Sequence, residues 1–426
     1  MPPAESISEQ DTASAVGTRQ RLGALAALFL RLGIIGFGGP LAHIGLMEDL
    51  FIARRKWATR EQFLEGLAIC NLLPGPTSTQ LSMYLGYLRA GVVGGVVSGT
   101  CFIGPAFLLV LGLAWAYVRY GALPQVGALF LAIGPVVIAI IANTLYRTGK
   151  TALTSPLLWV IALSTCTLTL YPLLPPGINL VVILLASGLV GVWRVVLGLP
   201  VLLLTGGRGL PRQPRPAHDE PTQPDTTTLK SLLPAPLLAL KALSLQAAPS
   251  TALLLPLALV FLKIGLLMFG GGLVVAPLLQ QELVDGPHWL TTRQLVDGLA
   301  LGQLTPGPVS VVATFAGFAV AGFPGGVVAT VAVFLPSFVL VLGLTPLLLR
   351  RYRSAFFTSF LRGVTAGALG TIAGAAILFG YAAITDLFTA AIALVSLALL
   401  LRWNINTTYL ILGAAVLGIG RALLGL

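Results

Sequence analysis

The sequence predicts an all-α integral membrane protein made of two inverted-topology repeats, with about ten spans plus two re-entrant Pro-Gly-Pro hairpins. Of the 426 residues, 56% are apolar and 9% charged, whereas soluble domains carry about 25% charged residues. Apolar runs reach the roughly 20 residues that a helix needs to cross a bilayer. The chain also contains an internal duplication, and the basic residues divide unequally between its two copies.

The net charge of +11 does not indicate a nucleic-acid partner, because the basic residues gather in short clusters beside apolar runs. Examples are Arg54-Arg55-Lys56, Arg147 with Lys150, and Arg350-Arg351. Such clusters carry topology information and face the headgroups of a lipid bilayer. The three cysteines lie far apart in apolar stretches, so we expect free thiols and no metal or other cofactor.

The duplication appears when Phe29 is aligned with Phe261, a shift of 232 positions that needs no gap until about residue 100. FLRLGIIGFGGPL then matches FLKIGLLMFGGGL, and NLLPGPTS matches QLTPGPVS. One extra residue in the first copy brings Pro105 onto Pro336. We therefore expect a disordered tail (1–20), an N-terminal repeat (21–204), a cytoplasmic linker (205–250) and a C-terminal repeat (251–426). Within the linker, Ser231–Ala248 is apolar enough to lie on the membrane surface.

Each repeat is expected to begin with one span that ends at a glycine-rich turn. A helix broken at Pro-Gly-Pro follows, over about 60–90 and 293–322. Four further spans come next in each repeat, because apolar runs of suitable length recur there. They are expected near 92–118, 124–145, 157–175 and 177–199, and near 326–349, 356–380, 384–401 and 405–425.

The loops before the two breaks differ in charge. The first holds four basic residues over 54–60, and its counterpart holds Glu282, Asp285, His288 and a single arginine, Arg293. Because basic loops stay in the cytoplasm, the two loops should lie on opposite sides of the membrane. An odd number of crossings per repeat then follows. We therefore favour a hairpin at each Pro-Gly-Pro over a broken crossing helix, with both termini outside.

Pro74-Gly75-Pro76 and Pro306-Gly307-Pro308 interrupt apolar helical runs. Proline removes an amide donor, so one helix ends there and the next presents free N–H groups. Such an N-terminus binds anions readily, although a simple kink would also explain one motif alone. Two breaks in inverted repeats would point two helix ends at one central site. The residues thus predict a secondary transporter for a small anion, with no catalytic residues.

Several further positions match between the repeats and could contact the anion. Arg31 and Lys263 could supply positive charge, although both could instead reach the membrane surface. Glu65 and Asp297 could carry a coupled proton or form ion pairs. His43 matches Val275, so we assign it no role. The remaining predicted substrate-binding residues lie in the breaks, beside them or in the glycine turns: Gly38, Gly39, Asn71, Pro74, Gly75, Pro76, Thr77, Ser78, Gln80, Gly270, Gly271, Gln303, Thr305, Pro306, Gly307, Pro308 and Ser310.

The paired pattern FGGP…NLLPGPTSTQ…GxxGG and FGGG…QLTPGPVSV…GFPGG…FLPSF resembles the chromate ion transporter family, of the long-chain type with two fused halves. The resemblance covers nearly the whole chain apart from the tail and the linker. It implies export of chromate, a sulfate-like divalent oxyanion, across the bacterial inner membrane, and chromate resistance. Gly272 stands where the first repeat has Pro40, so a role for that proline does not carry over.

Three alternatives remain open at this point. Sulfate or another oxyanion shares the shape and charge of chromate and is the first. A channel or a non-transporting membrane scaffold is the second. A membrane-embedded enzyme is the third, and the scattered histidines His43, His218 and His288 argue against it. The sequence leaves the oligomeric state open, with a homodimer as one option.

Overall fold

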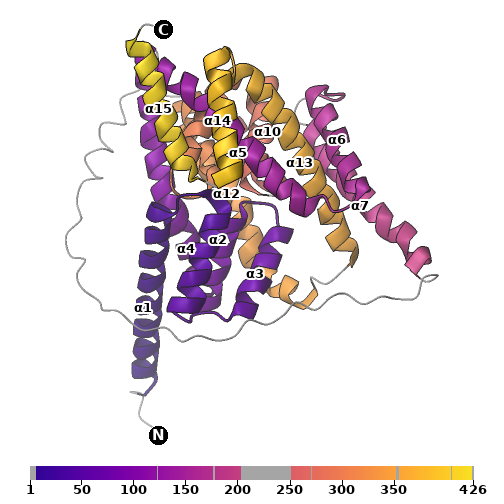
Figure 1. The fold of residues 1–426 in the computed structure, drawn as a ribbon. Coiled ribbons are helices and arrows are strands. Elements are labelled where there is room, and N and C mark those ends of the chain that lie inside the picture. The colour runs from indigo at the N-terminus through magenta and orange to yellow at the C-terminus, as the bar shows by residue number, and fades with distance from the viewer. Residues whose placement is uncertain are drawn as a thin grey trace.

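The computed structural model describes residues 6–121, 123–175, 178–202, 251–269, 271–351, 355–403 and 405–424. Within these ranges every regular element is a helix (Figure 1). The expected linker at 205–250, with its surface segment Ser231–Ala248, lies outside the described residues, as does Gly270.

The helices of the first repeat are α1 (Ser6–Ile35), α2 (Gly39–Glu48), the π-helical η1 (Asp49–Arg54), α3 (Arg60–Leu72), α4 (Thr77–Tyr120), α5 (Pro124–Ala152), α6 (Pro156–Leu170) and α7 (Asn179–Leu202). Those of the second are α9 (Thr251–Leu267), η2 (Gly272–Val274), α10 (Val275–Leu279), η3 (Gln280–Asp285), α11 (Thr292–Leu304), η4 (Val309–Val311), α12 (Val312–Arg351), α13 (Ala355–Ala383), α14 (Leu387–Trp403) and α15 (Thr407–Leu423). Helix α1 starts inside the segment that we expected to be a disordered tail.

Helix α4 is two helical arms joined by a sharp turn at Ala90 and Gly91, where φ of Gly91 is +63°. Ser98 Oγ donates to the carbonyl of Ser82 at 2.7 Å, although sixteen residues separate them. A straight helix would hold these residues about 24 Å apart. The short arm, residues 77–89, therefore folds back on the long arm, residues 92–120.

Helix α12 turns back in the same way. Ala321 and Gly322 have backbone angles within 10° of those at Ala90 and Gly91. The hydroxyls of Thr314 and Thr330 lie 2.7 Å apart across the turn. Both repeats thus contain an arm that runs from Pro-Gly-Pro to a glycine turn and a longer arm that returns.

The extra residue of the first repeat lies before this turn and not near residue 100, so that prediction was wrong. Ser78 and Ser310 are 232 positions apart, whereas Gly91 and Gly322 are 231 apart. The first arm begins as an α-helix, while its counterpart begins with the 3₁₀-helix η4. A 3₁₀-helix rises about 2.0 Å per residue instead of 1.5 Å, so three residues of it replace four.

The glycine-rich turns also reverse the chain. Phe29 of α1 packs on Phe51 of η1 with ring centroids 5.6 Å apart, although the turn at Gly38-Gly39 lies between them. In the second repeat, Lys263 of α9 pairs with Glu282 of η3 across the matching turn. The helix before each glycine turn, expected to be a span, therefore packs on the segment that follows the turn. The sequence did not predict this contact, because it joins two apolar segments across the turn.

The two repeats are interwoven. Helix α5 packs against α14 and α15 of the second repeat, and its counterpart α13 packs against α6 and α7 of the first. Glycines allow the close approach: Gly418 lies against the Ala128 backbone, and Gly367 lies against Ser187. Neither expected repeat therefore forms a core by itself.

The long arms of α4 and α12 run antiparallel at the centre of the molecule. Gly95 packs on Leu342 and Gly99 packs on Phe338, so the residue number rises along one arm as it falls along the other. Leu111 and Gly326 make the matching contact farther along the same pair.

The fold is that of an all-α, multi-pass membrane protein. Four described segments are long and apolar enough to cross a bilayer: Thr77–Tyr120, Pro124–Ala152, Val309–Thr345 and Ser359–Ala383. Shorter apolar helices surround them. Large apolar side chains such as Leu163, Trp193 and Leu394 are exposed on the outer helices, as expected where lipid replaces water.

Candidate functional site

The tips of four hairpins meet at the interface between the repeats. The amide of Gly75 donates to the carbonyl of Met268 at 2.7 Å, and the amide of Gly307 donates to the carbonyl of Gly36 at 2.9 Å. Gly75 and Gly307 match in the duplication, as do Gly36 and Met268. Each Pro-Gly-Pro therefore docks on the glycine-rich turn of the other repeat.

The local sequence explains why the chain breaks at these tips. Helices α3 and α11 end at Leu72 and Leu304, before a proline that lacks the N–H needed to continue a helix. Gly75 and Gly307 have φ of +130° and +101°, values that other residues rarely adopt. The next arm begins directly after Pro76 or Pro308, and neither N-terminus has a side-chain cap. Two buried helix N-termini with uncapped amides thus lie in the centre of the molecule.

The first turn of α4 is rich in buried polar groups. Ser78, Thr79 and Gln80 are at most 1% exposed. Gln80 Nε2 donates to the carbonyl of Pro74 at 2.6 Å and so closes the break. Thr79 Oγ1 and Gln80 Oε1 have no hydrogen-bond partner. Because unpartnered buried polar atoms are costly, Thr79 Oγ1, a hydroxyl that can donate, is a candidate contact for a bound anion, whereas Gln80 Oε1 can only accept.

His43 lies at this site, although its lack of a histidine counterpart had suggested no role for it. Its side chain is 1% exposed, and Nε2 lies 2.8 Å from the carbonyl of Gly36, the same oxygen that accepts from Gly307. Since that oxygen is an acceptor, Nε2 carries the proton and Nδ1 faces Ser78 Oγ at 3.5 Å. His43 was missed because only its lack of a counterpart marked it in the sequence.

The second break is more apolar. Ser310 Oγ donates to the sulfur of Met268 at 3.3 Å, and Thr305 Oγ1 donates to the carbonyl of Gly302 at 3.1 Å. Pro306, Gly307 and Pro308 are buried.

The other predicted contacts are placed less centrally. Asn71 is exposed and accepts from the Thr77 hydroxyl at 3.3 Å across the first break. Gln303 is half-buried. Gly38, Gly39 and Gly271 have positive φ and form the turns, with Gly38 exposed.

The predicted cations are not equivalent. Lys263 forms a 2.7 Å ion pair with Glu282, whose side chain is 10% exposed, whereas the matching Arg31 is exposed on α1. Leu50 occupies the position that matches Glu282. The acid beside Lys263 is therefore Glu282 and not Asp297.

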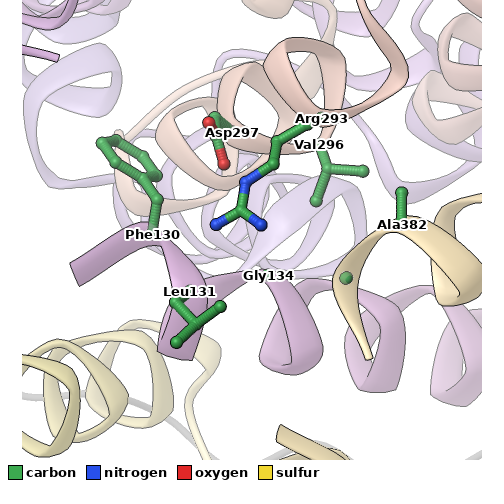
Figure 2. Close-up of a pocket in the computed structure, with 8 residues that line it drawn as sticks. Phe130, Leu131, Gly134, Arg293, Val296, Asp297 and Ala382 are labelled. Carbon is green, nitrogen blue, oxygen red and sulfur yellow. The ribbon is translucent and has the colours of Figure 1, made fainter. Parts of the chain in front are cut away.

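Asp297 is 6% exposed and accepts a 2.8 Å hydrogen bond from the hydroxyl of Tyr117 at the end of α4. Figure 2 shows its carboxylate beside Arg293 on one wall of a small pocket. Phe130, Leu131 and Gly134 of α5 and Ala382 and Ala383 of α13 line the rest. The matching Glu65 is half-buried on α3.

Comparisons with known proteins agree on one family. The family model described as "Chromate transporter" matches residues 23–192 and 255–419. A "Chromate transport protein" from Cupriavidus metallidurans is 36% identical over 93% of this chain and 92% of its own length. The "Probable chromate transport protein" of Synechococcus elongatus is 35% identical over 94% of both chains, and a "Chromate transport protein" of Pseudomonas aeruginosa is 32% identical over 82% of this chain and 78% of its own. No solved structure matches.

Proposed function

The chain belongs to the chromate transporter family, and on that premise we propose that it exports chromate across the bacterial inner membrane and so confers chromate resistance. The observation that carries the proposal is the meeting of two uncapped helix N-termini at the interface of the repeats. Free amides and the positive end of the helix dipole favour a divalent oxyanion there. Arg31 and Lys263 are the candidate cations for the path to this site.

The membrane potential favours export. Moving one charge across 100 mV is worth about 2.3 kcal/mol, so a dianion gains about twice that on leaving a cell that is negative inside. Exchange for another ion would also drive export. For exchange against a proton, we propose Asp297 and Glu65 as the carboxylates, because both are at least half-buried at matching positions.

We further propose that the repeats are inverted in the membrane, with the loop at 54–60 in the cytoplasm. The guanidinium of Arg89, the last residue of the short arm of α4, stacks on Trp57 in that loop at 4.8 Å, and the long arm begins directly after the turn that follows Arg89. Tyr117, near the end of the same arm, binds Asp297 in α11. About 38 Å of helix separates the start of the long arm at residue 92 from Tyr117, more than the hydrocarbon core of a bilayer. The starts of α3 and α11 thus belong on opposite sides.

Labelling from each side tests this topology. Lys56 and His288 match in the duplication, are exposed, and share a left-handed backbone with φ of 50° and 55°. In a chain without its native cysteines, Lys56→Cys should react with an impermeant maleimide only from the cytoplasm and His288→Cys only from outside. Reaction of both from the same side would contradict inversion.

Uptake of radiolabelled chromate by everted vesicles tests the function, because export then appears as accumulation. Wild-type protein should accumulate chromate saturably, and excess sulfate should compete. Arg31→Ala or Lys263→Ala should raise the KM about tenfold, the loss expected for one charge-assisted contact. Arg119→Ala, another exposed arginine that lies at the end of α4, is the control. Sulfate accumulation without chromate accumulation would favour sulfate as cargo, and uptake that never saturates would favour a channel.

A further inference from the structure

The two Pro-Gly-Pro breaks occupy matching positions, but their polar surroundings differ. Beside the first lie Thr79 and Gln80 in the first turn of α4, whereas the start of the second arm, where three residues replace four, has Val309 and Val311 on either side of Ser310. His43 lies beside Ser78, whereas Val275 holds the matching position in α10.

A further polar group at the first break comes from the other repeat. Ser337 of α12 is fully buried, and a Cβ added to Gly75 would clash with its hydroxyl. The matching neighbour of Gly307 is the methyl group of Ala106. The same packing position therefore carries a hydroxyl at one break and a methyl at the other.

The two breaks also differ in whether their buried polar atoms have hydrogen-bond partners. The hydroxyls of Thr79 and Ser337 are buried at or beside the first break without a partner, and Gln80 Oε1, which can only accept, also lacks one. At the second break, the hydroxyls of Thr305 and Ser310 both have partners. A tetrahedral oxyanion accepts several hydrogen bonds at once, and the hydroxyls and free amides around the first break can donate them.

Resting on the proposed function, we propose that the oxyanion binds at the first break alone, held by the start of α4, Thr79 and Ser337. His43 and Gln80 position this cradle, His43 through the carbonyl of Gly36 and Gln80 through the carbonyl of Pro74. The second break holds the first in place by its contact with Gly36 but takes no anion itself.

Substitutions that exchange residues between the two repeats test this proposal. Ser337→Ala installs the residue that the other repeat carries at the same packing position, and Thr79→Val replaces the hydroxyl with a methyl group, as in the valines of η4. Ala106→Ser, the reverse exchange beside Gly307, is the control. Thr79→Ser keeps the hydroxyl and tests for rescue.

The experiment measures radiolabelled chromate bound to the purified full-length protein at equilibrium, together with the KM in everted vesicles. We expect one chromate per chain. Thr79→Val and Ser337→Ala should each weaken binding and raise the KM about tenfold. Thr79→Ser and Ala106→Ser should stay within about twofold of wild type.

Two chromate ions per chain, or one whose affinity survives both Thr79→Val and Ser337→Ala, would overturn the inference. If the proposed function itself is wrong, the result differs from both of these outcomes, because wild-type vesicles would then accumulate no chromate. Protein that elutes as a single symmetric peak in size exclusion separates a binding defect from misfolding.

Discussion

At the residue scale, the central glycine of each Pro-Gly-Pro break lies at a position where a larger residue would not fit. Gly75 has φ of +130°, and a Cβ there would collide with Ser337 and Gln80. Gly307 has φ of +101° and touches the methyl of Ala106. Both positions need glycine for backbone conformation and for space.

Gly75→Ala should destabilise the protein by about 1–3 kcal/mol, the usual cost of a strained backbone, and should abolish saturable transport. Gly104→Ala is the control, because Gly104 lies within α4 and has no neighbour within 4 Å of an added Cβ. Thermal unfolding in detergent and vesicle uptake measure the two effects. Normal stability and uptake in Gly75→Ala would show that the tip is less constrained than described.

At the element scale, matched residues that carry no substrate role turn out to start matched helices. Thr59 and Gln62 form a capping box at the start of α3, and Thr291 and Gln294 form the same box at the start of α11. In each box the threonine hydroxyl oxygen accepts from the backbone N–H of the glutamine, and the side-chain oxygen of the glutamine accepts from the backbone N–H of the threonine. Local hydrogen bonding accounts for these identities between the repeats.

Thr59→Ala and Thr291→Ala should each lower the free energy of unfolding by about 1 kcal/mol, the typical value of an N-cap. Thr59→Ser and Thr291→Ser should keep most of it, because serine also accepts from the N3 amide. Thermal melting of all four variants measures the loss. Equal melting of the alanine and serine variants would rule out a capping role.

Asp386 links the start of α14 to α15. Its carboxylate accepts from the amide of Thr389 at 2.8 Å and from Arg421 at 2.6 Å. The bonds from Thr389 and then Arg421 lower the pKa of Asp386 from 3.8 to about 2. A lowered pKa in the folded state stabilises the protein above pH 3.8, and the gain disappears as the pH falls toward 2.

Asp386→Asn should therefore lower the melting temperature at pH 7, and the difference from wild type should shrink between pH 4 and pH 2. Melting curves of both proteins across this pH range measure the effect. A difference that stays constant down to pH 2 would mean that the charge of Asp386 contributes nothing.

At the scale of the whole molecule, the interweaving of the repeats predicts that neither folds alone. Helix α5 packs against α14 and α15, and α13 packs against α6 and α7, so each repeat completes the other. Expressed separately, residues 1–225 and 226–426 should aggregate or be degraded. Expressed together, they should copurify and restore chromate uptake. A stable, monodisperse fragment 1–225 on its own would contradict this prediction.

The sequence by itself determined the membrane class, the duplication, both helix breaks and the family resemblance. These follow from composition and from Gly and Pro at fixed spacing, which act locally on the backbone. Only the tertiary structure decided that the glycine-rich turns are hairpin tips, that Lys263 pairs with Glu282, and that His43 and Ser337 lie beside the first break. Each of these depends on contacts between segments far apart in the chain, and in an apolar sequence the pattern of residues is the same whichever helices meet.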